Sequence, residues 1–220
     1  MSHITLDRPW LEFDLDEDMQ VLSWALNRPG FVTANQILWR EVRNADLPIG
    51  FDVKSWLVDE LQARKAEDAV TLLTSRNITH FTEEEVSVGD TKAHAIATVG
   101  FSNAERVGHR VDRRGEDFGT INVALRLNVG LTQSGLLEAM SIVVQARTAA
   151  VMEAALHINT GIATGTGTDC VAVAAPKGVE CFAGLHTEIG EAIGRAVYNA
   201  VHDGAKQWLA SKREIDNAAP

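Results

Sequence analysis

Residues 163–170 read Ala-Thr-Gly-Thr-Gly-Thr-Asp-Cys and run directly into Val-Ala-Val-Ala-Ala. The loop therefore places three hydroxyls, two glycines and one carboxylate, Asp169, before an expected strand. Hydroxyl groups donate and accept hydrogen bonds without carrying net charge, and glycine lets backbone N–H groups approach a ligand closely. Such a loop is suited to contact with a polar, uncharged ligand.

Four other segments between the expected elements are also rich in Gly, Ser, Thr and Asn. They are 74–77, 98–108, 118–122 and 183–190. Because each lies at the end of an expected strand, we predict that the five loops form one polar pocket. The alternative is that they are only tight turns, which use the same residues.

Common catalytic and metal-binding motifs are missing. The sequence has no GxxxxGK[ST] phosphate loop, no HExxH or CxxC pair and no GxSxG elbow. Its seven histidines are scattered. We expect no metal site, although one assembled from His94, His109 or His186 with Asp169 stays open as an alternative.

The elements that position these loops follow from periodicity. Alternating apolar residues, and buried-type apolar runs, predict strands over 4–15, 19–26, 31–42, 69–75, 120–131 and 161–175, with a hairpin over 78–101. Helical spacing predicts helices over 51–66, 132–157 and 187–213. Asp52 is the expected N-cap of the first helix, and Thr132 or Ser134 that of the second.

Three helices are too few to alternate with every strand of a parallel sheet. The order of elements instead predicts a mixed α/β (α+β) fold, in which a largely antiparallel sheet packs against the long helices. No linker or repeat divides the chain, so we expect a single domain over 1–220, with a frayed tail from about 214 to 220.

Composition narrows the function classes. The formal net charge of −10 argues against nucleic-acid binding, which needs clustered Lys and Arg. No apolar run approaches the roughly 20 residues that span a bilayer, and no signal peptide precedes the first strand. We therefore expect a cytoplasmic protein that binds no membrane, with Cys170 and Cys181 as buried thiols.

Five segments, in this order and at these distances, resemble the adenosylcobinamide amidohydrolase family, often called CbiZ. They are ATVGFSNAERVG, GTINVAL, the helix segment QARTAAVMEA, ATGTGTDCVAVA and FAGLHTEIGEAIGRAVYNAV. The resemblance covers residues from about 20 to 205 and is clearest from Thr98 onward. Where such families often show Lys in the Ala-rich helix, this chain has Arg147, which keeps the charge but not the compact ammonium.

The resemblance implies a corrinoid-salvage enzyme. Such an enzyme hydrolyses the amide between the corrin ring and its aminopropanol arm, giving adenosylcobyric acid. The cobalt belongs to the corrinoid substrate, so no cofactor of the protein's own is expected. A corrin carries acetamide and propionamide groups on its rim, which neutral donors and acceptors would recognise.

The resemblance also suggests roles for the residues of the loops. Amide hydrolysis needs an activated nucleophile, donors for the oxyanion and an acid for the leaving amine. Asp169 would orient or deprotonate a water or the Thr168 hydroxyl, the loop backbone would bind the oxyanion, and His186 would act as acid or base. The substrate contacts would be Ser102, Asn103, Thr120, Asn122, Thr164, Gly165, Thr166, Gly167 and Thr187.

Several alternatives stay open. Asp169 could cap a turn or pair with a buried arginine, and Glu153 is expected to pair with Arg147 or another base. A non-catalytic corrinoid carrier could use the same pocket, and a nucleotide-handling enzyme is a third possibility. The tryptophans of the N-terminal quarter would lie in the core, at a homo-oligomer contact, or against the corrin face. They are Trp10, Trp24, Trp39 and Trp56.

Overall fold

An eight-stranded mixed sheet forms the centre of the computed structural model, which describes residues 3–43, 46–47, 50–112 and 119–218. The strand order is β4-β3-β2-β12-β8-β6-β5, with β1 paired to β2. Only β12–β8 and β3–β4 are parallel pairs. The predicted mixed α+β class with a largely antiparallel sheet is confirmed.

The strands of this sheet are β1 (Ile4–Asp7), β2 (Trp10–Ser23), β3 (Gly30–Glu41), β4 (Val70–Thr74), β5 (Thr82–Val88), β6 (Thr91–Val99), β8 (Ile121–Leu127) and β12 (Cys170–Ala175). Two small antiparallel pairs lie outside it: β7 (Ala104–Glu105) with β11 (Gly165–Thr166), and β9 (His157–Ile158) with β10 (Gly161–Ile162). The helices are α1 (Val53–Arg64), α2 (Gln133–Glu153) and α3 (Glu188–Ala218), and a 3₁₀ turn covers Ile78–His80.

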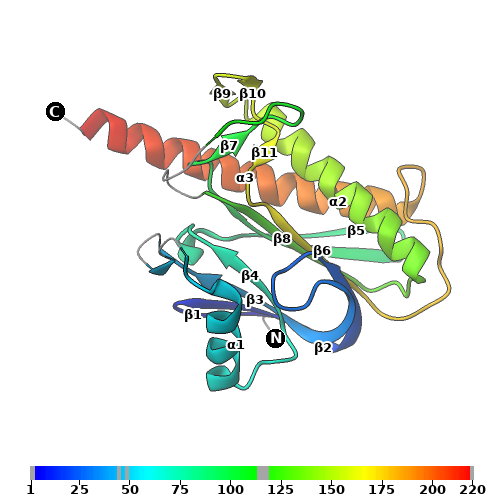
Figure 1. Cartoon of the computed structure of the whole chain (residues 1–220). Helices are drawn as coiled ribbons and strands as arrows, with labels where there is room; N and C mark the ends of the chain where they lie inside the picture. The colour runs from blue at the N-terminus through cyan, green and yellow to red at the C-terminus, as the bar shows by residue number, and fades with distance from the viewer. Residues whose placement is uncertain (1–2, 44–45, 48–49, 113–118, 219–220) are drawn as a thin grey trace.

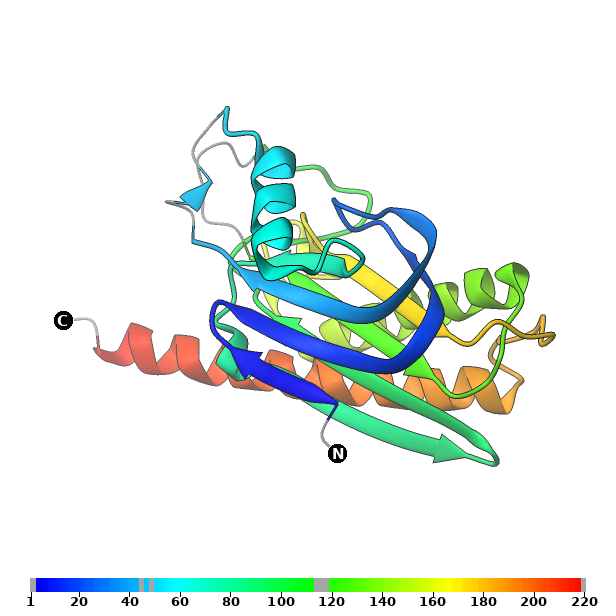
Figure 2. The same cartoon turned by 90° about the horizontal axis from the view of Figure 1, so that it is seen from below.

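One long bent strand replaces two predicted strands near the N-terminus. Strands over 4–15 and 19–26 were expected. The first segment instead holds β1 and the start of β2, and β2 continues to Ser23 with a bulge between Asp14 and Met19. Asp16 takes a left-handed φ of 63° inside the bulge, and its N–H donates to the side chain of Asp14 at 2.8 Å. A bulge adds residues to one strand and bends it, and Figure 2 shows how strongly β2 and β3 curve.

This bend curls the sheet so that β3 and β4 share a core with strands of the other half of the sheet. Apolar side chains of β2, β3 and β4 pack in one cluster with Ile96, Ala124 and Ala172, which come from β6, β8 and β12. The free edge of β4 is therefore turned inward. Asn27 covers part of that edge, because its side chain bonds the carbonyl of Ala69 at 2.8 Å and the N–H of Thr71 at 3.1 Å.

The helices cover the outside of the curl. α2 and α3 lie on one side of the sheet and α1 on the other (Figure 1). The apolar stripe of α3 is buried against β5, β6 and α2 from Ile189 to Val201, with Trp208 half-buried at its end. α3 continues past the predicted end at Arg213 to Ala218.

Both predicted helix starts are correct. The carboxylate of Asp52 accepts a hydrogen bond from the N–H of Ser55 at 3.1 Å, and the hydroxyl of Thr132 accepts one from the N–H of Gly135, also at 3.1 Å. These contacts satisfy N–H groups that have no partner inside the helix. Thr132, and not Ser134, is thus the cap of α2.

By length and composition alone, α2 is apolar enough to cross a membrane, which the sequence analysis had not expected. The helix packs on α3 and β12. Its outer face is exposed at Ser141, Gln145 and Ala149, so α2 is buried on its inner side only.

Candidate functional site

Three of the predicted loops meet at one edge of the sheet. β8 and β12 are parallel neighbours, with Asn122 opposite Cys170, so the segments that precede both strands lie together. The segment that follows β6 joins them, because β6 runs antiparallel to β8. We call the resulting group the polar cluster. It consists of Asn103, Thr120, Asn122, Thr166, Thr168 and Asp169.

Asp169 is the best-connected member of the polar cluster. Its side chain is 8% exposed, and Oδ2 lies 2.9 Å from Nη1 of Arg147. The carboxylate also accepts hydrogen bonds from the N–H of Ile121 and the N–H of Thr166, each at 3.1 Å, and from the Thr166 hydroxyl. Burial raises the pKa of Asp169 above its usual value, and these four partners oppose the rise. The ion pair with a buried arginine, one of the two expected alternatives, is present.

Asn103 and Thr168 link the three loops. Oδ1 of Asn103 accepts from the N–H of Gly119 at 3.0 Å, and its Nδ2 lies 3.4 Å from the Thr168 hydroxyl. That hydroxyl donates to the carbonyl of Gly119 at 2.8 Å. Asn103 is buried whereas Thr168 is exposed, so Thr168 presents its side of this network to solvent.

Thr120 and Asn122 connect the polar cluster to β4. The Thr120 hydroxyl lies 2.9 Å from the carbonyl of Thr168 and 3.1 Å from Oδ1 of Asn122. Nδ2 of Asn122, which is fully buried, donates to the carbonyl of Leu73 at 2.7 Å. This bond ties the start of β8 to β4 across the curled sheet.

A pocket of about 490 Å³ opens beside the polar cluster. Thr120, Thr168 and Asp169 form part of its wall. The rest is mainly apolar and comes from the β2–β3 turn, from β4, and from residues around the start of α1. The apolar wall includes Trp24, Leu26, Leu47, Val53 and Leu73. The polar side of this pocket agrees with the loop composition, whereas its apolar side was not predicted.

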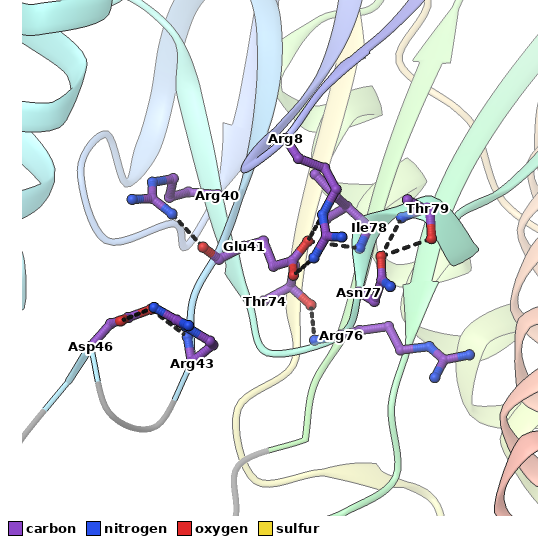
Figure 3. Close-up of polar contacts among 10 residues, drawn as sticks. All are labelled: Arg8, Arg40, Glu41, Arg43, Asp46, Thr74, Arg76, Asn77, Ile78 and Thr79. Carbon is purple, nitrogen blue, oxygen red and sulfur yellow. Dashed lines mark hydrogen bonds and ion pairs between the residues drawn. The ribbon is translucent and has the colours of Figure 1, made fainter.

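The ends of β3 and β4 at the pocket rim are held by polar contacts (Figure 3). Glu41 accepts hydrogen bonds from Arg8 at 3.1 Å and from the N–H of Ile78 at 3.3 Å. Arg43, which also lines the pocket, pairs with Asp46 at 3.2 Å. These contacts fix the strand ends that carry the rim.

Arg76, in the predicted polar loop 74–77, points away from the Glu41 contacts (Figure 3). Its Nε and Nη2 atoms are buried and make no hydrogen bond. Burial lowers the pKa of this guanidinium. The composition of the loop indicated a polar segment but did not predict that the guanidinium of Arg76 would be buried.

Other predicted residues serve the fold at the margin of the polar cluster. Thr164 is buried, and its hydroxyl accepts from the N–H of Val107 at 2.8 Å. Gly165 pairs with Glu105 in the small sheet of β7 and β11. Ser102 is exposed, and its backbone N packs so closely on Gly119 that a Cβ there would lie 2.5 Å away.

The loop of His186 and Thr187 lies at the opposite edge of the sheet. It follows the end of β12, whereas Asp169 precedes its start, and six extended residues separate the two edges by roughly 17 Å. The Thr187 hydroxyl accepts from the N–H of Gly190 at 2.9 Å, as a cap of α3, and His186 is exposed. The prediction that all five loops form one pocket is therefore wrong for this loop, because it follows the end of β12 and Asp169 precedes its start. The loop 74–77 does reach the pocket, since Ser75 lines it.

Two N–H groups of the 164–169 loop that could have bound an oxyanion are engaged elsewhere. The N–H of Thr166 donates to Asp169 at 3.1 Å, and that of Gly167 donates to the carbonyl of Asn103 at 3.4 Å. Both groups are already used by the fold. The partner of Glu153 also differs from the prediction, because Glu153 accepts from the hydroxyl of Tyr198 while Arg147 pairs with Asp169.

Cys170 lines the pocket, but its chemistry is that of a neutral thiol. Burial raises its pKa to about 11, so the reactive thiolate is scarce near neutral pH. Cys181 is exposed, contrary to the expected burial. Among the residues that the structure describes, no three His, Cys, Asp or Glu side chains are placed to hold a metal ion, so the assembled histidine site is not formed there.

Comparison with known proteins adds three findings. Residues 2–213 match the family model of adenosylcobinamide amidohydrolase (CbiZ). The uncharacterized protein MJ1613 of Methanocaldococcus jannaschii is 28% identical over 193 residues, which cover 73% of this chain and 74% of that protein. The PH0078 protein of Pyrococcus horikoshii OT3 aligns in structure with a TM-score of 0.45 and 11% identity, over 89% of this chain and 76% of that chain.

Proposed function

Since this chain belongs to the adenosylcobinamide amidohydrolase family, we propose that it hydrolyses the amide between the corrin ring and the aminopropanol arm of adenosylcobinamide. Water supplies the oxygen of the new C–O bond, the C–N bond breaks, and the leaving amine takes up a proton. The products are adenosylcobyric acid and aminopropanol, which fits a role in corrinoid salvage. Cobalt enters as part of the substrate.

The observation that supports this proposal most is the position of the polar cluster on the wall of a mainly apolar pocket. The uncharged groups of Asn103, Thr120 and Asn122 hold this wall in one arrangement. A substrate with apolar ring faces and an amide-bearing rim needs both kinds of surface. The formal charge of −10 and the missing phosphate loop disfavour a nucleotide as the ligand.

Within the proposal, Thr168 contacts the scissile amide. Thr168 is an exposed residue of the pocket wall, and its hydroxyl lies next to Nδ2 of Asn103. If the hydroxyl turns from the carbonyl of Gly119, the two groups can hold the carbonyl oxygen or orient the attacking water. Asp169 accepts four contacts already, which fill the lone-pair positions of a carboxylate. Its role is then to position the loop beside Thr168.

Incubation with adenosylcobinamide, followed by detection of aminopropanol and cobyric acid by mass spectrometry, tests the function. Thr168→Val removes the hydroxyl at nearly constant volume and is expected to lower kcat/KM by about tenfold or more. Thr160→Val is the matched control, because the Thr160 hydroxyl makes no hydrogen bond. Equal rates in both variants would exclude Thr168 from the chemistry.

The engaged N–H groups of Thr166 and Gly167 favour a second candidate, a corrinoid carrier without catalysis. Such a protein would bind cobinamide and release no aminopropanol. The same incubation separates the two functions, provided that binding is measured in parallel by equilibrium dialysis.

A further inference from the structure

Trp24 stands out among the five tryptophans. Within the described part of the chain, Trp10, Trp56 and Trp208 each contact another ring or a cation, and Trp39 is fully buried. No such contact involves Trp24, whose side chain lies on the pocket wall with 46% of the residue exposed.

The indole of Trp24 is nevertheless held in place. Its Nε1–H donates to the backbone carbonyl of Asp169 at 2.8 Å. One edge of the ring is thus fixed to the polar cluster. A large aromatic surface that is fixed and left in contact with water indicates a binding surface, because aromatic rings gain most when a second apolar face covers them.

The surroundings of Trp24 extend this surface. Leu26, 41% exposed, belongs to the same pocket wall, and Leu47 and Val53 line it from the segments before and at the start of α1. Asp169 is ion-paired with Arg147, and Arg43, the other charged residue of the wall, is paired with Asp46 and largely exposed. The other residues of the wall are uncharged and mainly apolar.

We infer that Trp24 stacks against a flat, conjugated ring face of the ligand, with the ring's edge directed toward Thr168. The identity of the ligand as a corrinoid rests on the proposed function. The flat face can come from the corrin ring itself or from the adenine of its axial ligand, and the two sources share this chemistry. Trp24 then decides affinity, while Thr168 and the polar cluster contact the amide.

Binding of cobyric acid, cyanocobinamide and adenosylcobinamide by equilibrium dialysis tests this inference, with hydrolysis followed separately. Trp24→Ala is expected to weaken binding by at least about tenfold, and Trp24→Phe by less, since it keeps a ring but loses the bond to Asp169. For hydrolysis, KM should rise more than kcat falls. Trp208→Phe is the control, because Trp208 packs on Phe101 in the helix layer and does not line the pocket.

Loss of affinity for all three corrinoids in Trp24→Ala would support stacking on the corrin, and loss for adenosylcobinamide alone would support stacking on adenine. Unchanged affinity for all three in a folded Trp24→Ala protein would overturn the inference. If that variant does not fold, Leu26→Asn makes the same wall polar without touching the Trp24 bond, and equal affinity there has the same meaning. Trp24-dependent binding without aminopropanol release would refute the proposed function and leave this inference standing.

Discussion

Replacing Arg147 by methionine tests whether its ion pair with Asp169 holds the 164–169 loop. Only 12% of the Arg147 side chain and 8% of that of Asp169 are exposed. Methionine keeps much of the aliphatic stem and leaves Asp169 without its counter-charge. Leaving one charge of a buried pair alone costs about 3–5 kcal/mol. We expect the free energy of unfolding at pH 8 to fall by that amount.

The loss of stability in Arg147→Met should depend on pH, and the pKa of Asp169 determines whether it grows or shrinks as the pH falls. Burial raises this pKa in the folded protein while Arg147 opposes the rise, so removing Arg147 raises it further. A carboxyl whose pKa is higher in the folded than in the unfolded chain stabilises the fold when the pH is below its unfolded pKa of about 3.9. This stabilisation is lost as the pH rises through the pKa of the folded protein. The deficit of Arg147→Met is therefore largest at pH 8 and shrinks as the pH falls toward 4.

Urea unfolding followed by tryptophan fluorescence measures both effects. Arg195→Met is the control, because Arg195 is 60% exposed and pairs with Glu191 at 3.5 Å, and such pairs contribute less than about 1 kcal/mol. The double variant Arg147→Met with Asp169→Asn should recover part of the loss, since no buried charge remains alone. A deficit below about 1 kcal/mol at pH 8, or one that is equal at pH 8 and pH 4.5, would show that the Arg147–Asp169 pair does not stabilise the fold as a buried ion pair.

Asp169→Asn should lower turnover of adenosylcobinamide at least about tenfold in folded protein, because the loop beside Thr168 loses its anchor; turnover like that of the wild type would remove Asp169 from the site. Cys170→Ala should keep kcat/KM within about twofold, since the thiol, with its pKa near 11, is protonated at pH 7.5; a large loss would point to a catalytic thiolate. His186→Ala should also change kcat/KM less than about twofold, because His186 is exposed at the other edge of the sheet, and a tenfold loss would contradict that separation. Activity should survive prolonged treatment with EDTA, as expected of a hydrolysis without a metal cofactor, and loss restored by a divalent ion would overturn this expectation.

Local patterns predicted most of the elements. The helical spacing over 51–66 and the Asp52 cap located α1, and the alternating pattern over 78–101 located the β5–β6 hairpin. These signals come from residues close together in the chain, which is why they can be read without knowing the fold. The bulge at Asp14–Met19 was missed because charged residues in a strand give the same pattern as a loop.

The candidate site was predicted only in part, because local patterns identify loops but not which loops meet. Gly, Ser, Thr and Asn identified the loops, but which loops meet depends on strand direction. Parallel pairing of β8 with β12 brings Asn122 to Cys170 and leaves His186 at the far edge. The exposure of Trp24 depends on the curl of the sheet, and no pattern in its own neighbourhood distinguishes it from the buried Trp39.

The inward-turned edge of β4 has a consequence for how this protein behaves at high concentration. A strand edge with open backbone groups can recruit a strand from another molecule and start aggregation. Here the side chains of Asn27 and Asn122 occupy the groups of Ala69, Thr71 and Leu73 along that edge. The two asparagines therefore leave these three backbone groups unavailable for pairing with a strand of another molecule.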